Sequence, residues 1–191
     1  MSIRITSNGH NFSNIDTISP VEGEMVTIVV ESIKAMLIPT PLFDEVTPKE
    51  HLLSGGISFE ADKEDVVVVK HDKLTTALIV VPISLLSEIE KLYGSNVRFS
   101  TPLLNSAFGR GHEVCLHLSP DNTLLCINLY NGGDRVFSEL FEVKTSADVL
   151  YWLSRIGEGY DLDDYTLYIE GGGKELLKLL NRYYKNVIPC E

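Results

Sequence analysis

Short alternations of apolar and polar residues predict several strands in the first half of the chain. Residues 3–6 alternate in this way and Asn8-Gly9 is a strong two-residue turn signal, so residues 3–15 are expected to form a hairpin. Runs rich in apolar and β-branched residues predict further strands at 25–31, 35–38, 65–70 and 75–81. The first half is therefore expected to be rich in β-structure.

Two helices are predicted between these strands. Thr47-Pro48-Lys49-Glu50 has the spacing of a capping box with proline at the first helical position, and Gly55-Gly56 would end that helix. Residues 84–93 carry apolar side chains at helical spacing, and Gly94 supplies the end. The buried stripe of this second helix is expected to comprise Leu85, Leu86, Ile89 and Leu92.

The second half begins with three strands whose register can be tested by their apolar positions. If residues 119–122 form the first turn, Leu116 lies opposite Leu125 and Cys115 opposite Cys126. If Gly132-Gly133 lies at the second turn, Leu125 lies opposite Leu140. The two turns then give one consistently apolar face, which indicates an antiparallel meander.

Helix and strand alternate after the meander. A helix is predicted at 146–156, with Thr145 and Asp148 in capping-box spacing, followed by a strand at 165–170, three glycines and a helix at 174–185. The first half is a looser version of the same order. We therefore expect an α/β fold with mixed sheets and two subdomains, residues 1–111 and 112–191, divided at Gly109-Arg110-Gly111.

Charge narrows the possible functions. The 191 residues carry 16 Lys and Arg against 27 Asp and Glu, which gives a formal charge of −11. Residues 1–111 hold 14 acids and 9 bases and residues 112–191 hold 13 and 7, so the acidity is spread over both halves. Because nucleic-acid binders concentrate Lys and Arg against phosphate, this distribution predicts no nucleic-acid partner.

Apolar runs and cysteine content indicate the compartment. The start of the chain has no continuous apolar stretch behind basic residues, and the longest uncharged run, residues 74–87, is too short to span a membrane and contains Pro82. Three widely spaced cysteines do not make a disulfide framework. We expect a cytoplasmic protein with no membrane span, an unknown protein partner and an unknown oligomeric state.

The repeated order resembles the ribonuclease H-like unit that is duplicated in the actin, sugar kinase and heat-shock ATPase superfamily. The sequence also resembles an uncharacterised bacterial family, the domain of unknown function numbered 3822, which has this architecture. The residues that carry this second resemblance are Ser2-Ile3-Arg4-Ile5, Asn8-Gly9, Phe12-Ser13, Leu37-Ile38-Pro39-Thr40-Pro41-Leu42-Phe43, Val81-Pro82, Thr101-Pro102-Leu103-Leu104, Phe137-Ser138, Phe141 and residues 145–151. The resemblance implies a fold but no established activity.

An ATPase of this superfamily would have an Asp-x-Gly-x-x-x-Thr or Ser pattern on the first hairpin of each subdomain. There glycine admits phosphate and aspartate positions the metal. Residues 7–13 keep Gly9 and Ser13 but have Ser7 in place of the aspartate. Residues 117–123 keep Thr123 alone, and Pro120 removes a backbone donor. The sequence therefore predicts no catalytic residue, and ordinary turns are the simpler interpretation of both segments.

The best match to a nucleotide-contacting element is Gly171-Gly172-Gly173-Lys174, where a strand ends and a helix begins. Glycines permit close approach of a ligand, and free amides at a helix N-terminus favour an anion. A tight connection without a ligand explains the same pattern equally well. No cofactor is predicted; a nucleotide bound by this segment together with Gly9, Ser13 and Thr123 would be ATP with Mg²⁺.

A cluster of Cys115, His117 and Cys126 is a candidate for a metal site. It has no evident fourth ligand and lacks the short ligand spacing of zinc modules, so no metal is predicted. The two cysteines are expected to pack as small apolar residues, with His117 partly buried.

Three functions follow from these observations. The preferred one is a non-catalytic or vestigial ATPase-fold protein that acts as a binding or scaffold component. The alternative is a divergent ATPase or small-molecule kinase that recruits Asp121 or Asp16 to a metal. The third is pairing through an exposed face of the second meander that includes Tyr130, Phe137 and Phe141.

Overall fold

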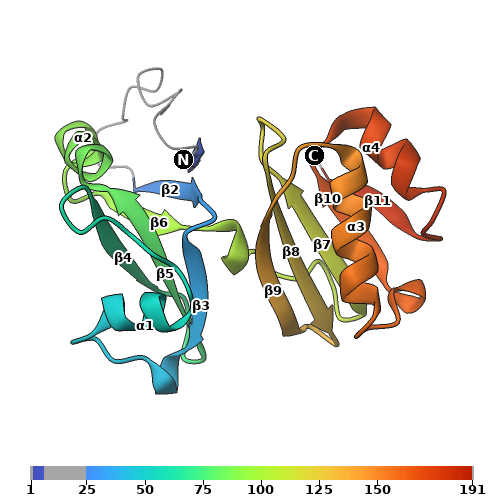
Figure 1. The fold of residues 1–191 in the computed structure, drawn as a ribbon, viewed down its shortest axis with the longest axis horizontal. Coiled ribbons are helices and arrows are strands. Elements are labelled where there is room, and N and C mark those ends of the chain that lie inside the picture. Colours follow the sequence, from blue (N-terminus) through green and yellow to red (C-terminus); the bar gives the residue numbers. More distant parts are fainter. Residues whose placement is uncertain (1, 7–24, 191) are drawn as a thin grey trace. The chain divides into compact units, whose positions relative to one another are not determined.

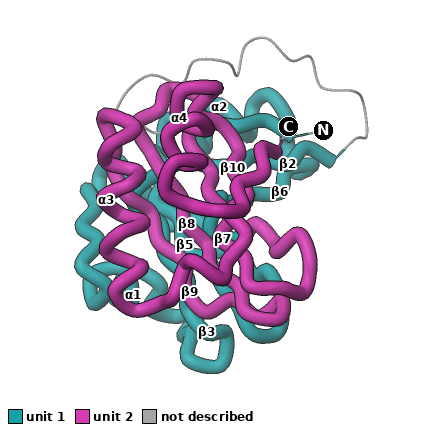
Figure 2. The backbone as a smooth tube through the Cα atoms, turned by 90° about the vertical axis from the view of Figure 1, so that its right-hand side faces the viewer, with its two compact units in different colours: residues 1–104 teal, residues 105–191 magenta. Residues whose placement is uncertain are grey.

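The computed structural model describes residues 2–6 and 25–190, which fall into two compact units (Figures 1 and 2). Unit 1 comprises residues 1–104 and unit 2 residues 105–191. Residues 105–111, which the sequence had placed with the first half, thus belong to the second unit. Most of the hairpin predicted over residues 3–15 lies outside the described residues.

The described residues of unit 1 form two three-stranded sheets. The strands β1 (Ser2–Thr6), β2 (Val26–Glu31) and β6 (Val97–Ser100) form a parallel sheet in the order β1-β2-β6. The strands β3 (Ala35–Pro39), β5 (Thr75–Pro82) and β4 (Glu64–Lys70) form an antiparallel sheet with β5 in the centre. The predicted strands at 25–31, 35–38, 65–70 and 75–81 are confirmed.

Among its described residues, unit 1 has the helices α1 (Pro48–Ser54) and α2 (Ile83–Tyr93), with short 3-10 turns at Thr40–Leu42 and Pro102–Leu104. The capping box predicted for α1 is wrong, because the Thr47 hydroxyl donates to Asp44 Oδ2 at 3.0 Å. In α2, Leu85 and Ile89 are buried as predicted, but Tyr93 takes the last buried position and Leu92 is exposed. Tyr93 follows Ile89 by four residues, so it continues the apolar face of α2 at helical spacing in place of Leu92.

Unit 2 has a single five-stranded sheet in the order β11-β10-β7-β8-β9. The strands β7 (His112–Leu118), β8 (Leu124–Asn131) and β9 (Asp134–Glu142) form the predicted antiparallel meander. The strand β10 (Thr166–Glu170) pairs in parallel with β7 and also with β11 (Val187–Cys190).

The helices α3 (Ser146–Gly157) and α4 (Gly173–Leu180) separate the last strands, and a 3-10 turn spans Leu162–Asp164. The predicted capping box of α3 forms, and Asp148 Oδ2 accepts a hydrogen bond from the Thr145 N–H at 2.8 Å. The helix α4 ends at Leu180, five residues before its predicted end. No helix among the described residues is long and apolar enough to cross a membrane.

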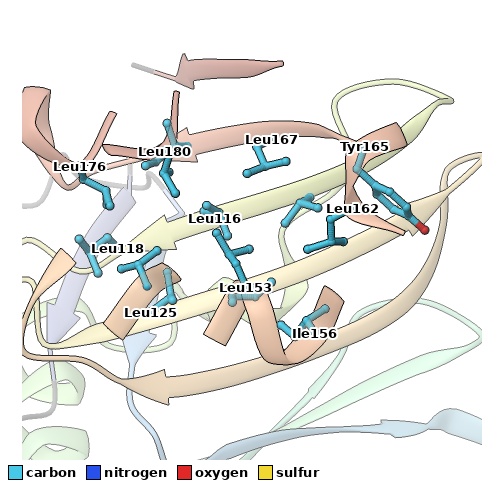
Figure 3. Close-up of a cluster of buried hydrophobic side chains, with 14 of the residues drawn as sticks. Leu116, Leu118, Leu125, Leu153, Ile156, Leu162, Tyr165, Leu167, Leu176 and Leu180 are labelled. Carbon is cyan, nitrogen blue, oxygen red and sulfur yellow. The ribbon is translucent and has the colours of Figure 1, made fainter. Parts of the chain in front are cut away.

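Both helices of unit 2 cover the same face of the sheet. Leu153 and Ile156 of α3 and Leu176 and Leu180 of α4 lie in one buried cluster with the leucines of β7 and β8 (Figure 3). Burial of such a side chain is worth roughly 1.5–3 kcal/mol, so this cluster dominates the stability of the unit. The opposite face of the sheet carries the polar and thiol side chains of β7 and β10.

The meander has a different register from the predicted one. Leu116 lies opposite Ile127 and Leu118 opposite Leu125, a shift of two positions along β8 that leaves the same side chains on the apolar face. Between β8 and β9 the predicted register holds beside the turn, but a bulge between Leu129 and Tyr130 shifts the rest by one. A shift of one residue exchanges the two faces of a strand.

The bulge overturns the aromatic surface predicted for β9. Phe137 lies opposite Leu129 and Phe141 opposite Leu125, so both rings pack against the core beneath α3. Phe141 stacks on Trp152 with ring centroids 4.3 Å apart. Tyr130 is buried on the other face, where its hydroxyl donates to the carbonyl oxygen of Asn105. These three residues therefore do not form one exposed patch.

Candidate functional site

The predicted glycine segment and the turn that contains Thr123 meet at one edge of the unit 2 sheet. Because β7 and β10 are parallel neighbours with His117 opposite Glu170, both strands end at this edge. The turn that follows β7 and the turn that follows β10 are thereby brought together. Gly9 and Ser13, the other predicted phosphate contacts, lie outside the described residues.

The three glycines form a left-handed connection into α4. Gly171, Gly172 and Gly173 have φ values of +87°, +74° and +63°, a region that residues with a Cβ rarely adopt. A Cβ on Gly171 would lie 2.5 Å from the carbonyl oxygen of Leu118, and one on Gly172 would lie 2.4 Å from Leu176 Cδ2. The left-handed backbone, and at Gly171 the clash with the Leu118 main chain, thus account for the first two glycines without any ligand.

The start of α4 has features that favour an anion and one that opposes it. Gly172 is the N-cap and offers no side-chain acceptor to the first amides of the helix. Lys174 is exposed in the first turn, where its ammonium group can meet a phosphate. Glu175 lies in the same turn and adds a negative charge. The segment can therefore hold a phosphate through backbone amides and Lys174, with Glu175 weakening the contact.

The turn after β7 is closed by its own side chains. Asp121 Oδ1 accepts hydrogen bonds from the Ser119 hydroxyl at 2.6 Å, the Thr123 hydroxyl at 2.9 Å and the Thr123 N–H at 3.2 Å. Desolvation acts to raise the pKa of Asp121, but these donors outweigh it and hold the pKa below its usual value. The Asp121 carboxylate and the Thr123 hydroxyl are thus both engaged within the turn, with Asn122 in the left-handed region at φ +57°.

Beside the two turns lies a hydrogen-bonded pair, His117 and Glu170, that the sequence alone did not indicate. His117 Nδ1 and Glu170 Oε2 are 3.0 Å apart, and the side chains are 6% and 30% exposed. The two residues come together only because β7 and β10 pair in parallel in this register. No local sequence pattern reveals that register, so sequence reasoning missed the pair. The pair links the penultimate residue of β7 to the last residue of β10, so it holds the starts of the two turns together.

The cysteine and histidine cluster differs from its predicted geometry. Cys115 lies opposite Asn128, and His117 is the residue opposite Cys126. In the part of the chain that the structure describes, no group of three or more His, Cys, Asp and Glu side chains is arranged to hold a metal ion. Cys115, Cys126 and Cys190 are all free thiols.

Burial suppresses the reactivity of these thiols. Desolvation, followed by the charge of Glu113, raises the pKa of Cys115 to about 12. Complete burial raises the pKa of Cys126 even further, and desolvation raises that of Cys190, which is only partly buried. Neither central cysteine is therefore suited to act as a nucleophile.

Comparisons with known proteins identify the fold. No family model matches the chain, and no curated protein sequence matches it. A solved structure from Bacteroides thetaiotaomicron, described as a protein with actin-like ATPase fold and unknown function, matches with a TM-score of 0.70 and 17% identity over 86% of this chain and 68% of that one. The chain therefore has a mixed α/β structure that closely matches an actin-like ATPase fold.

Two further solved structures match less well. The cytoplasmic domain of EpsL from the Vibrio cholerae type II secretion system matches with a TM-score of 0.41 and 11% identity, over 75% of this chain and 60% of that domain. The PilM–PilN type IV pilus biogenesis complex matches with a TM-score of 0.44 and 12% identity, over 86% and 69% of the two chains.

Proposed function

We propose that the chain is a vestigial, non-catalytic member of the actin-like ATPase fold that acts in the cytoplasm as a binding or scaffold component. In this proposal each unit descends from one ribonuclease H-like subdomain, and the first copy is degenerate. The order of the unit 2 sheet supports this origin: an antiparallel meander is followed by two parallel strands, and a helix precedes each of them.

The observation that carries the non-catalytic part of the proposal is the closed turn at Asp121. A metal-assisted phosphoryl transfer needs a carboxylate directed at the metal or at its bound water. Asp121 is the acidic residue of the turn that follows β7, and three donors of that turn hold its Oδ1 atom. Directing the Oδ1 atom to Mg²⁺ would break these three hydrogen bonds within the turn that closes the β7–β8 hairpin.

A weak contact with a nucleotide phosphate is retained in the proposal. Gly171, Gly172, Gly173 and Lys174 supply amides and a cation at one edge of the sheet, and the turn that contains Thr123 borders them. Gly9 and Ser13, the other residues predicted to contact a nucleotide, lie outside the described residues. Because Glu175 is acidic and the chain carries a charge of −11, the affinity for a nucleotide is expected to be low.

Reversing the charge of Lys174 tests this proposal. The full chain, its Lys174→Glu variant and its Lys178→Glu variant are titrated with ATP and Mg²⁺ by calorimetry, and phosphate release is followed in parallel. Lys178 is an exposed lysine in the last turn of the same helix, so it controls for net charge. We expect weak binding that K174E reduces several-fold and K178E leaves unchanged, with no phosphate release above the blank. Turnover that K174E abolishes would overturn the non-catalytic proposal.

The alternative is a divergent ATPase or small-molecule kinase. The observation in its favour is that Asp121 lies in the turn bordering the glycine segment, at the same edge of the sheet. Asp16, the other candidate carboxylate, lies outside the described residues. This alternative predicts that Asp121→Asn abolishes phosphate release while ATP still binds, whereas the vestigial protein has no such release to lose.

A further inference from the structure

The strand β4 is an outer strand of its sheet, and its central residues are all apolar. The strand pairs with β5 along one side, and no other described strand pairs with it. Its sequence is Glu-Asp-Val-Val-Val-Val-Lys, so four consecutive valines are flanked by charges only at the two ends. An edge of this kind is a template for pairing with another strand.

The hydrogen-bond pattern shows which backbone groups face outward. The Ile83 N–H donates to the Lys63 carbonyl and the His71 N–H donates to the Thr75 carbonyl, so odd-numbered positions of this segment bond toward β5. In an antiparallel pair the intervening residues direct their N–H and C=O groups to the other side. The even-numbered residues Glu64, Val66, Val68 and Lys70 therefore offer their backbone groups to the outer edge.

The other long outer strand in the described part of the chain is protected against such pairing. The strand β9 carries the bulge at Val136 and the charged Glu139 at its centre, two features that disfavour strand addition. The remaining outer strands are short, at four or five residues each: β1, β3, β6 and β11. Among the outer strands that the structure describes, β4 alone combines greater length with an uncharged centre and a regular register.

We propose that a second copy of this chain adds its β4 to this edge, antiparallel and centred on Val67. This register places Glu64 opposite Lys70 of the second copy, and Lys70 opposite Glu64 of the second copy. It also joins Val66 and Val68 as hydrogen-bonded neighbours, so the outward backbone groups of both strands meet. The charge order of the strand, acidic at the start and basic at the end, is complementary to itself only in the antiparallel direction.

Contacts within each copy compete with this pairing and make it weak. Asp65 Oδ1 accepts a hydrogen bond from the outward Val66 N–H at 2.9 Å, and the Glu64 N–H donates to the Glu60 carbonyl. Glu64 also pairs with Lys34 at 2.8 Å, and Lys70 pairs with Glu45. The dimer therefore forms in a concentration-dependent way, and loss of the Asp65 carboxylate strengthens it.

A charge exchange between two chains tests the register. Sedimentation of the full chain over a concentration series is compared with Glu64→Lys, with Lys70→Glu and with their equimolar mixture. Each variant alone places like charges opposite each other at both ends, whereas the mixture restores both attractions. We expect a dimer for the parent chain, at least a ten-fold weaker one for each variant, and recovery in the mixture. A parent chain that stays monomeric at all concentrations, or variants that associate as the parent does, would overturn the proposal.

A second pair of variants keeps the test valid if Glu64→Lys disturbs folding. Val68→Lys places a charge at the exposed centre of the edge, and Val136→Lys places one on β9; the two valines are 37% and 43% exposed. We expect V68K to abolish the dimer and V136K to leave it intact. Equal effects of the two substitutions would contradict pairing through β4.

Discussion

Gly171 and Leu118 approach so closely that a Cβ on the glycine would lie 2.5 Å from the leucine carbonyl oxygen. The contact joins the end of β7 to the connection between β10 and α4. Because Gly171 also has a φ of +87°, an alanine there would meet both backbone strain and a clash with main-chain atoms.

Gly171→Ala should therefore lower the free energy of unfolding by about 2–5 kcal/mol, since left-handed strain and overpacking act together. Gly173→Ala is the matched control, because this glycine has a φ of +63° with no atom within 4 Å of its Cβ position. Its cost should be about 1–2 kcal/mol, from strain alone. Urea denaturation of both variants measures the difference, and equal losses would show that the contact with Leu118 is unimportant.

In the unit 2 meander, the sequence pattern predicted which side chains are buried but not which residues lie opposite each other. The alternation of Val114, Leu116 and Leu118 identified the buried face of β7, because side chains of one strand alternate between its faces. The pattern did not identify the partners, since a shift of two residues preserves every face. Hydrogen bonds from Ser119 and Thr123 to Asp121 fix the turn and therefore the register, and the alternation of apolar residues carries no information about these bonds.

The bulge in β9 is a feature that alternation alone cannot predict. One extra residue, Val136, moves Phe137 and Phe141 to the core face, whereas the unbroken pattern placed them outside.

The candidate site was also predictable only in part. Its glycines were visible as a run in the sequence, but the His117–Glu170 pair depends on two strands 53 residues apart.

Removing one member of the His117–Glu170 pair should destabilise the protein measurably. Glu170→Ala leaves the buried imidazole without this acceptor, which costs about 1–3 kcal/mol. Glu158→Ala is the control, because Glu158 pairs with Arg155 on the surface and such pairs are worth only about 0–1 kcal/mol. Chemical denaturation of the two variants should rank them in this order. A loss for E158A as large as that for E170A would contradict the structural role of the buried pair.

The capping box of α3 should make stability depend on acidic pH. Backbone hydrogen bonds from Lys144 and Thr145 hold the pKa of Asp148 below its ordinary value of 3.8. A carboxyl whose pKa is lower in the folded state stabilises the protein above its unfolded pKa, and this contribution is lost as pH falls through the folded pKa. The melting temperature of Asp148→Asn should therefore fall less between pH 7 and pH 2 than that of the parent. Parallel curves for the two proteins would rule out this contribution.

The three thiols should react with iodoacetamide in an order set by burial. Only the thiolate is nucleophilic, and with a pKa of about 12 the Cys115 thiol is about 0.01% ionised at pH 8. Cys126 is fully shielded and its pKa is raised further, whereas Cys190 is partly exposed near the end of β11. Mass spectrometry of the folded chain should show modification of Cys190 first, and Cys190→Ser should remove this fast phase.

Unfolding the chain in urea is the control for the thiol prediction. All three thiols should then react alike, because the difference arises from the folded environment. Alkylation of Cys115 as rapid as that of Cys190 in the folded chain would show that the polar face of the unit 2 sheet is open to solvent at its centre.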